Sequence, residues 1–159
     1  MKDLNGAELA GYMKENQAHL ARSLRARKVQ PKLVIIRDNN NPVIGKYVSL
    51  KKRYGEDIGI IVEDWLREDV TDAIREANQN SSVHGVIVQL PLVGEYELNE
   101  VLSEITPEKD VDGLGDRAKF DSATATAINW LLAGYNIDLE KARIALVGRG
   151  RLVGGPLEK

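Results

Sequence analysis

The chain of 159 residues is 43% apolar and 29% charged, and it carries a formal charge of −2 at pH 7. A chain of this length can bury one hydrophobic core, with little left for a second. The nearly neutral charge, without a basic stripe, argues against a nucleic acid as the main partner. No stretch approaches the roughly 20 consecutive apolar residues that cross a membrane.

The residue types also limit the possible chemistry. Cysteine is absent, which excludes disulfides and thiolate catalysis. The two histidines, His19 and His84, lack the spacing of metal ligands, so we expect no metal site. The first six residues contain no apolar segment, so we expect no signal peptide and a cytoplasmic protein.

Helices and strands are predicted to alternate along the first two thirds of the chain. Apolar residues at helical spacing predict helices over residues 6–27, 44–54, 69–79 and 98–105, and apolar runs predict strands over residues 33–36, 58–62 and 83–89. Gly55 is expected to end the second helix, and Asp69 or Thr71 to cap the third. This order predicts an α/β fold with a mostly parallel sheet and helices on both faces.

The pattern changes after Gly115. Residues 121–134 predict a connecting helix, and residues 142–147 predict a strand that leads directly into a glycine-rich segment, residues 148–156. A glycine-rich loop after a strand is how a dinucleotide-binding domain begins. However, Gly148, Gly150 and Gly154 do not follow the Gly-x-Gly-x-x-Gly spacing. The spacing alone is equally compatible with a phosphate-binding turn and with an ordinary strand-to-helix turn.

Tyr47 and Lys51 are four residues apart and therefore share one helix face. If that face lines a pocket, the ring can stack on a planar ligand while the amine reaches the ligand's edge. A lysine held beside apolar groups has a lowered pKa and can exchange protons near neutral pH. The alternative is a half-buried tyrosine that packs on the stem of a lysine.

Two polar residues follow predicted elements at the edge where parallel sheets bind ligands. Gln89 lies where an apolar strand ends and the turn Leu90-Pro91 begins, so its amide can bond both a ligand and a neighbouring amine. Asp112 lies on a tight turn and can accept paired N–H donors from a ring. The alternatives are an ordinary strand-end glutamine and a turn aspartate that bonds its own backbone.

Taken together, four segments resemble the bifunctional methylenetetrahydrofolate dehydrogenase/methenyltetrahydrofolate cyclohydrolase family. These are Tyr47-Val-Ser-Leu-Lys51-Lys52, His84-Gly-Val-Ile-Val-Gln-Leu-Pro-Leu92, Pro107-Glu-Lys-Asp-Val-Asp-Gly113 and Val147-Gly-Arg-x-x-x-Val-Gly-x-Pro156. The four occur in the family's order and at compatible separations, which is far more specific than any one of them.

The resemblance implies oxidation of 5,10-methylene-tetrahydrofolate by NADP and hydrolysis of the resulting methenyl cation to 10-formyl-tetrahydrofolate. It implies that Lys51 handles the proton of the hydrolysis, that Gln89 orients Lys51, and that Tyr47 stacks on the folate. Asp112 would anchor the pterin ring, with Leu90 and Pro91 beside it. The implied partners are tetrahydrofolate derivatives, and the complete protein is expected to be a homodimer that binds neither nucleic acid nor a membrane.

For the cofactor, the resemblance implies an NADP site at Gly148, Arg149, Gly150, Val153 and Gly154, with Arg149 suited to the extra phosphate of NADP. Three segments depart from the family. The Gly-Asp-x-x-x-Ser stretch is replaced by residues 37–45 without the serine. The Pro-x-Thr-Pro-x-Gly linker becomes residues 122–127 and keeps only Thr124. The serine of the Gly-Arg-Ser loop is Gly150.

We therefore expect a folate-binding catalytic α/β domain over residues 1–118, a connecting helix over 119–134, and the first strand and phosphate loop of an incomplete NADP-binding domain over 135–159. A complete domain of that kind needs roughly 100–150 residues, so we expect this chain to be part of a longer protein. Two alternatives stay open: a cyclohydrolase without dehydrogenase activity, and a folate-binding module without catalysis.

Overall fold

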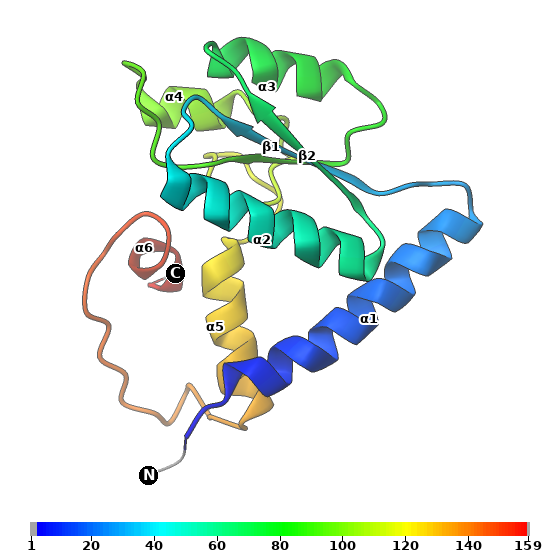
Figure 1. Cartoon of the computed structure of the whole chain (residues 1–159). Helices are drawn as coiled ribbons and strands as arrows, with labels where there is room; N and C mark the ends of the chain where they lie inside the picture. The colour runs from blue at the N-terminus through cyan, green and yellow to red at the C-terminus, as the bar shows by residue number, and fades with distance from the viewer. Residues whose placement is uncertain (1–2, 159) are drawn as a thin grey trace.

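A computed structural model describes residues 3–158 of the chain. Its strands are β1 (Lys32–Arg37), β2 (Ile61–Leu66) and β3 (Gly85–Val88). Its helices are α1 (Gly6–Ala26), α2 (Pro42–Ile58), α3 (Val70–Gln79), α4 (Leu98–Ser103), α5 (Ala123–Gly134) and α6 (Gly154–Leu157). Figure 1 shows the sheet between α2 on one side and α3 with α4 on the other.

The three strands form one parallel sheet in the order β2-β1-β3. Lys32 of β1 is in register with Ile61 of β2, and Leu33 of β1 with Gly85 of β3. An isolated parallel bridge between Val86 and Asp110 extends the sheet beyond β3. Because all these segments run in the same direction, their carboxyl ends lie at one edge, where α/β proteins bind ligands. The predicted α/β fold with a parallel sheet covered on both faces is confirmed.

The central strand β1 supplies side chains to two hydrophobic cores. Val34 and Ile36 are fully buried on the face covered by α3 and α4. Ile35 is fully buried on the opposite face, against Ile44 and Val48 of α2. Side chains alternate between the faces of a strand, so the apolar run of β1 is explained by a strand with both faces covered. This packing fixes α2 across the sheet and thereby sets the position of its polar residues.

The predicted end of α2 and the predicted start of β2 are both wrong by several residues. Gly55 lies inside the helix and is buried, and the helix ends at Gly59, whose φ of +81° is the left-handed conformation that glycine adopts easily. A β-carbon at Gly55 would lie 2.3 Å from a methyl carbon of Val62. Gly55 is therefore required by close helix–strand packing rather than by helix termination.

The strand β2 continues past the predicted residue 62 because its polar residues have partners. Glu63 pairs with Lys32 at 2.6 Å, and Asp64 pairs with Arg37 at 2.8 Å. Two other elements are shorter than predicted, with β3 covering four residues and α4 covering six. At α3, the side chain of Asp69 accepts a hydrogen bond from the backbone of Asp72, so Asp69 rather than Thr71 is the cap.

The strand predicted over residues 142–147 is not formed. These residues have no regular secondary structure and are all exposed, with Ile144 and Val147 exposed by 62% and 97%. A strand needs a neighbour to bond its backbone groups, and no described segment lies beside this one in a ladder. The connecting helix is present as α5, and in Figure 1 the segment after it loops away from the sheet to reach α6.

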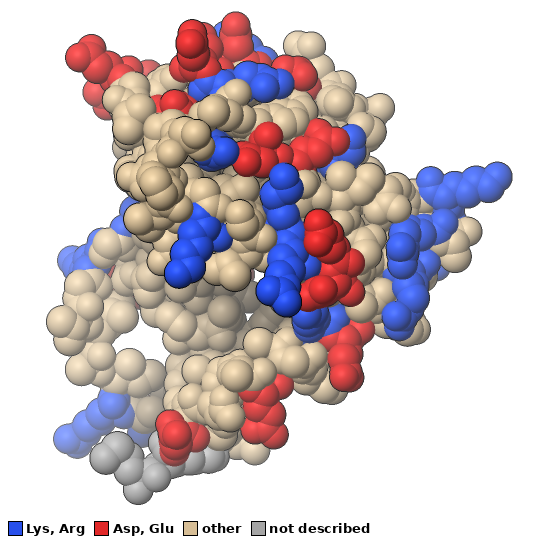
Figure 2. All heavy atoms as spheres, viewed as in Figure 1, with Lys and Arg blue, Asp and Glu red and all other residues tan. Residues whose placement is uncertain are grey.

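The surface carries both signs of charge. Figure 2 shows acidic and basic side chains interspersed over the visible face, without a large area of one sign. The helix α1 extends away from the sheet and leaves Leu20 and Leu24 exposed by 54% and 40%. Among the described residues, no helix has both the length and the apolar character needed to cross a bilayer.

Candidate active site

Tyr47, Lys51, Gln89 and Asp112 line one pocket of about 470 Å³ at the carboxyl edge of the sheet. Its volume lies within the range of about 300–1,000 Å³ typical of small-molecule sites. The walls come from α2, the end of β3, the turn after residue 110, the start of α5 and the glycine-rich segment. The other lining residues are Val43, Ile44, Ile87, Val88, Leu90, Pro91, Leu114, Ser122, Ala123, Thr124 and Leu152.

The amine of Lys51 donates a hydrogen bond of 2.7 Å to Oε1 of Gln89. Lys51 is held in place by α2, because Val48 and Ile44 anchor that helix to the sheet about one and two turns earlier. The backbone N–H of Gln89 donates to the carbonyl of Ile36, and its side-chain Nε2 donates to the carbonyl of Leu90. With its amide oriented in this way, Gln89 presents its oxygen to the amine.

The charges of Lys51 and Asp112 act on each other across the pocket. Burial lowers the pKa of Lys51 below its ordinary value of 10.5, and the negative charge of Asp112 opposes part of that shift. Burial raises the pKa of Asp112 above its ordinary value of 3.8, an effect that Lys51 opposes and Asp110 increases. Both pKa values are therefore shifted toward neutral pH for the same reason: burial makes the charged form of each group less favourable.

Tyr47 lines the same pocket from α2, but its side chain remains 57% exposed. An exposed ring at a pocket mouth leaves one face free for a flat ligand, whereas a ring packed into the core would not. Leu90 and Pro91 are joined by a cis peptide bond and also line the pocket. The pocket thus combines an aromatic ring, an amine, an amide and a carboxylate within apolar surroundings.

Hydrogen bonds between two loops, which the sequence analysis did not anticipate, support this part of the pocket. Oδ2 of Asp38 accepts from the backbone N–H groups of Val93 and Gly94, at 2.7 and 2.9 Å. Nδ2 of Asn39 donates to the carbonyl of Pro91 at 3.1 Å. The loop after β1 therefore holds the loop after β3. The only advance signal was the run of turn-forming residues from Asp38 to Pro42, which does not reveal a partner 55 residues away.

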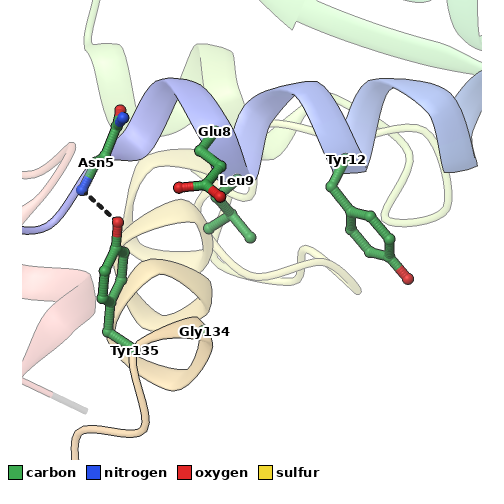
Figure 3. A pocket seen from close by; sticks show the side chains of 6 residues that line it. All are labelled: Asn5, Glu8, Leu9, Tyr12, Gly134 and Tyr135. Carbon is green, nitrogen blue, oxygen red and sulfur yellow. Dashed lines mark hydrogen bonds between the residues drawn. The ribbon is translucent and has the colours of Figure 1, made fainter.

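A second hollow of about 370 Å³ lies where the start of α1 meets the end of α5. Figure 3 shows it between Glu8, Leu9 and Tyr12 on one side and Tyr135 on the other, with the backbone N–H of Asn5 donating to the tyrosine hydroxyl. None of the predicted site residues lines it. The candidate site is therefore the pocket at the sheet edge.

Comparison with known proteins agrees with this arrangement. The family model described as "Tetrahydrofolate dehydrogenase/cyclohydrolase, catalytic domain" matches residues 4–112. The chain belongs to this family. The bifunctional protein FolD of Macrococcus caseolyticus is 33% identical over 175 residues, which cover 99% of this chain and 61% of that protein. FolD of Chlamydia trachomatis is 31% identical over 170 residues, which cover 97% and 58%.

A solved structure extends the likeness to the fold. The crystal structure of the bifunctional FolD methylenetetrahydrofolate dehydrogenase/cyclohydrolase from Campylobacter jejuni matches with a TM-score of 0.92 at 29% identity, covering 97% of this chain and 60% of that one. This member of the tetrahydrofolate dehydrogenase/cyclohydrolase family thus spans about 60% of the length of the relatives it matches. The family match includes Tyr47, Lys51, Gln89 and Asp112 but ends before the glycine-rich segment.

In this family member, the glycine-rich segment is packed closely on itself and is preceded by residues without regular secondary structure. Gly154 is buried so close to Gly148 that a β-carbon on it would lie 1.9 Å from the Gly148 carbonyl oxygen. The guanidinium of Arg149 pairs with Glu158. No strand precedes the loop, and the helix that follows has four residues. Gly150 and Val153 are joined by a backbone hydrogen bond and line no part of the pocket.

Proposed function

We propose that this chain binds a tetrahydrofolate one-carbon derivative in the pocket at the sheet edge and hydrolyses 5,10-methenyl-tetrahydrofolate to 10-formyl-tetrahydrofolate. The observation that carries the proposal is the Lys51–Gln89 hydrogen bond of 2.7 Å inside a pocket that Asp112 also lines. Family membership and the names of the relatives support the choice of substrate.

Lys51 is assigned the role of general base. The methenyl carbon between N5 and N10 is already a cation, so hydrolysis needs a placed water and a proton acceptor. Neutral Lys51 takes a proton as the water oxygen bonds to this carbon. The bond to N5 then breaks, N5 takes up the hydroxyl proton, and the formyl group stays on N10. Lys51 releases its proton to solvent, so one water is consumed and one proton is formed.

The lowered pKa of Lys51 suits this role in two ways. A larger share of the amine is neutral and able to accept a proton at physiological pH. The neutral form also avoids repulsion of the cationic substrate. Gln89 positions this amine through a neutral amide oxygen, so it adds no negative charge. A carboxylate in the same place would also accept the bond, but its charge would raise the pKa of Lys51.

The remaining pocket residues are assigned to substrate binding. Asp112 accepts N–H donors of the pterin ring, which pair well with the two oxygens of a carboxylate. Tyr47 stacks on the flat part of the folate from the pocket mouth. Leu90 and Pro91 supply an apolar part of the lining. These assignments are supported by the position of all four side chains in one pocket.

The dehydrogenase reaction is proposed only for this folate half combined with a complete dinucleotide-binding domain. No step is assigned to NADP here, because the strand expected before its predicted contacts is not formed and Arg149 is paired with Glu158. Those predicted contacts are Gly148, Arg149, Gly150, Val153 and Gly154. We further propose a cytoplasmic location and, for the complete protein, a homodimer. Both follow from the family resemblance rather than from a contact in this structure.

The decisive experiment follows the loss of methenyl-tetrahydrofolate absorbance after addition of the purified chain, above the spontaneous rate. We expect hydrolysis by the wild type and none above background with Lys51→Gln, while Lys52→Gln, which changes the exposed neighbour, keeps wild-type activity. Circular dichroism establishes that each variant is folded. Binding of the folate without hydrolysis would instead identify a non-catalytic module, and retained hydrolysis by folded Lys51→Gln would reject Lys51 as the base.

A further inference from the structure

Asp110 is the one acidic side chain buried in the core of the described residues, with 1% of its surface exposed. Its two carboxylate oxygens are both used within its own turn. Oδ1 accepts from the backbone N–H of Gly113 at 3.0 Å, and Oδ2 accepts from that of Gly115 at 2.8 Å. Because Asp110 bonds to Gly113 and Gly115, the two bonds close a turn that contains Asp112.

Both donors are glycines, and the geometry requires this. Gly113 has a φ of +67°, and a β-carbon there would lie 2.5 Å from the carbonyl oxygen of Phe120. A β-carbon at Gly115 would lie 2.9 Å from Oδ2 of Asp110 itself. A side chain at either position would displace the backbone from the carboxylate. The turn is therefore shaped around the Asp110 carboxylate.

The same turn is fixed to the rest of the fold from two directions. Backbone groups of Lys109 and Asp110 join it to β3, through a 2.7 Å bond from the N–H of Val86 to the carbonyl of Lys109 and the parallel bridge at Asp110. The amine of Lys109 donates to the carbonyls of Ala77, Asn78 and Asn80 at the end of α3, at 2.8 to 2.9 Å.

We infer that Asp110 is a positioning residue, which holds the turn so that the carboxylate of Asp112 faces the pocket across from Lys51. The inference rests on the proposed folate site. Asp110 does not line the pocket and touches no substrate, so it acts only through Asp112. Burying the Asp110 carboxylate beside that of Asp112 costs free energy. A role in holding the turn gives a reason for this cost.

The test is a double-mutant cycle in the hydrolysis assay. Asp110→Asn keeps the shape of the side chain but turns its amide hydrogens toward a backbone donor. We expect KM for methenyl-tetrahydrofolate to rise about ten- to hundredfold while kcat changes little, because a displaced binding group weakens substrate capture. In the Asp112→Asn background, the same change is expected to add less than about twofold, because the residue through which it acts is already altered.

Two further variants keep the test decisive. Asp69→Asn makes the same carboxylate-to-amide change at the cap of α3, outside the pocket, and is expected to leave KM unchanged. If Asp110→Asn does not fold, Lys109→Met loosens the same turn from outside and should raise KM only when Asp112 is intact. If Asp110→Asn raises KM equally in the wild-type and Asp112→Asn backgrounds, or lowers kcat at constant KM, the role proposed for Asp110 is wrong while the proposed function still stands. Absence of hydrolysis by the wild type overturns it together with the proposed function.

Discussion

Lys51 and Gln89 are joined by a 2.7 Å hydrogen bond in which the amine is the donor and a neutral amide oxygen is the acceptor. The lysine is thereby oriented by a group that carries no charge, at a position where burial lowers the pKa of its amine. The charge of Asp112, which lines the same pocket, opposes part of that shift. Orientation and charge are thus controlled by two different residues, which can be changed separately.

Gln89→Glu is predicted to shift the pH profile of hydrolysis to higher pH. A carboxylate at this position would stabilise the protonated amine and raise the pKa of Lys51, so less of the neutral base would be present at pH 7. The measurement is kcat/KM against pH, whose acidic limb reports the pKa of the base in the free enzyme. Gln79→Glu adds the same charge at an exposed position on α3 and should leave the limb in place.

Asp112→Asn is predicted to shift the same limb in the opposite direction. The Asp112 charge raises the pKa of Lys51, so its removal leaves burial unopposed and lowers that pKa further. Activity should therefore persist to lower pH than in the wild type, although KM rises because a binding group is lost. A limb that stays where it is in this variant would show that the two groups do not interact.

Folate and nucleotide ligands are predicted to differ in their effect on thermal stability. A ligand present at 100 times its Kd stabilises the folded state by about 2.7 kcal/mol, which raises Tm by several degrees. We expect 10-formyl-tetrahydrofolate to raise Tm of the wild type and to have a smaller effect on Asp112→Asn. NADP alone should leave Tm unchanged, because residues 142–147 form no strand and the following helix α6 has only four residues. A rise in Tm with NADP would contradict this interpretation.

Two glycines of the same helix are predicted to respond oppositely to alanine. A β-carbon at Gly55 would overlap Val62, so Gly55→Ala should lower the free energy of unfolding by about 1–3 kcal/mol. No heavy atom outside the helix backbone lies within 4 Å of a β-carbon at Gly45, so Gly45→Ala should raise that free energy by up to about 1 kcal/mol. Urea unfolding of both variants measures the two effects against one wild-type curve.

Arg37→Met is predicted to destabilise the fold strongly. The guanidinium is buried at the end of β1 and binds both oxygens of Asp64, at 2.8 and 3.0 Å, and the carbonyl of Asn39. Its loss leaves a largely buried carboxylate unpaired, for which we expect a cost of about 3 kcal/mol. Arg75→Met removes an exposed pair with Asp72 and should cost less than about 1 kcal/mol in the same unfolding measurement.

Local signals in the sequence were sufficient to predict the parallel sheet and to place the candidate residues at one edge of it, whereas their proposed roles came from the family resemblance. The apolar runs identify the strands, and the positions of Gln89 and Asp112 after predicted elements place them at the ligand-binding edge. Element ends were less predictable. Gly55 looked like a helix terminus because close packing against Val62 and a left-handed turn select the same residue type.

The remaining features depend on contacts between distant residues. The strand over 142–147 was predicted from its own apolar residues. A strand forms only beside another strand, and the segment's own sequence does not show whether such a neighbour is present. The bonds from Asp38 to Val93 and Gly94 and the role of Asp110 are likewise invisible locally. In the sequence alone, nothing distinguishes Asp110 from Asp112, because burial and hydrogen bonding are properties of the folded turn.

The start of α5 and Leu152 form one wall of the pocket, and the two are joined because the hydroxyl of Ser122 donates to the carbonyl of Leu152 at 3.0 Å. Shortening the protein to the stretch that carries the four polar side chains would therefore leave their cavity open on that side. The enclosed pocket is in this sense a property of the chain from Val43 to Leu152, and a minimal version has to retain the segments that contribute no chemistry of their own.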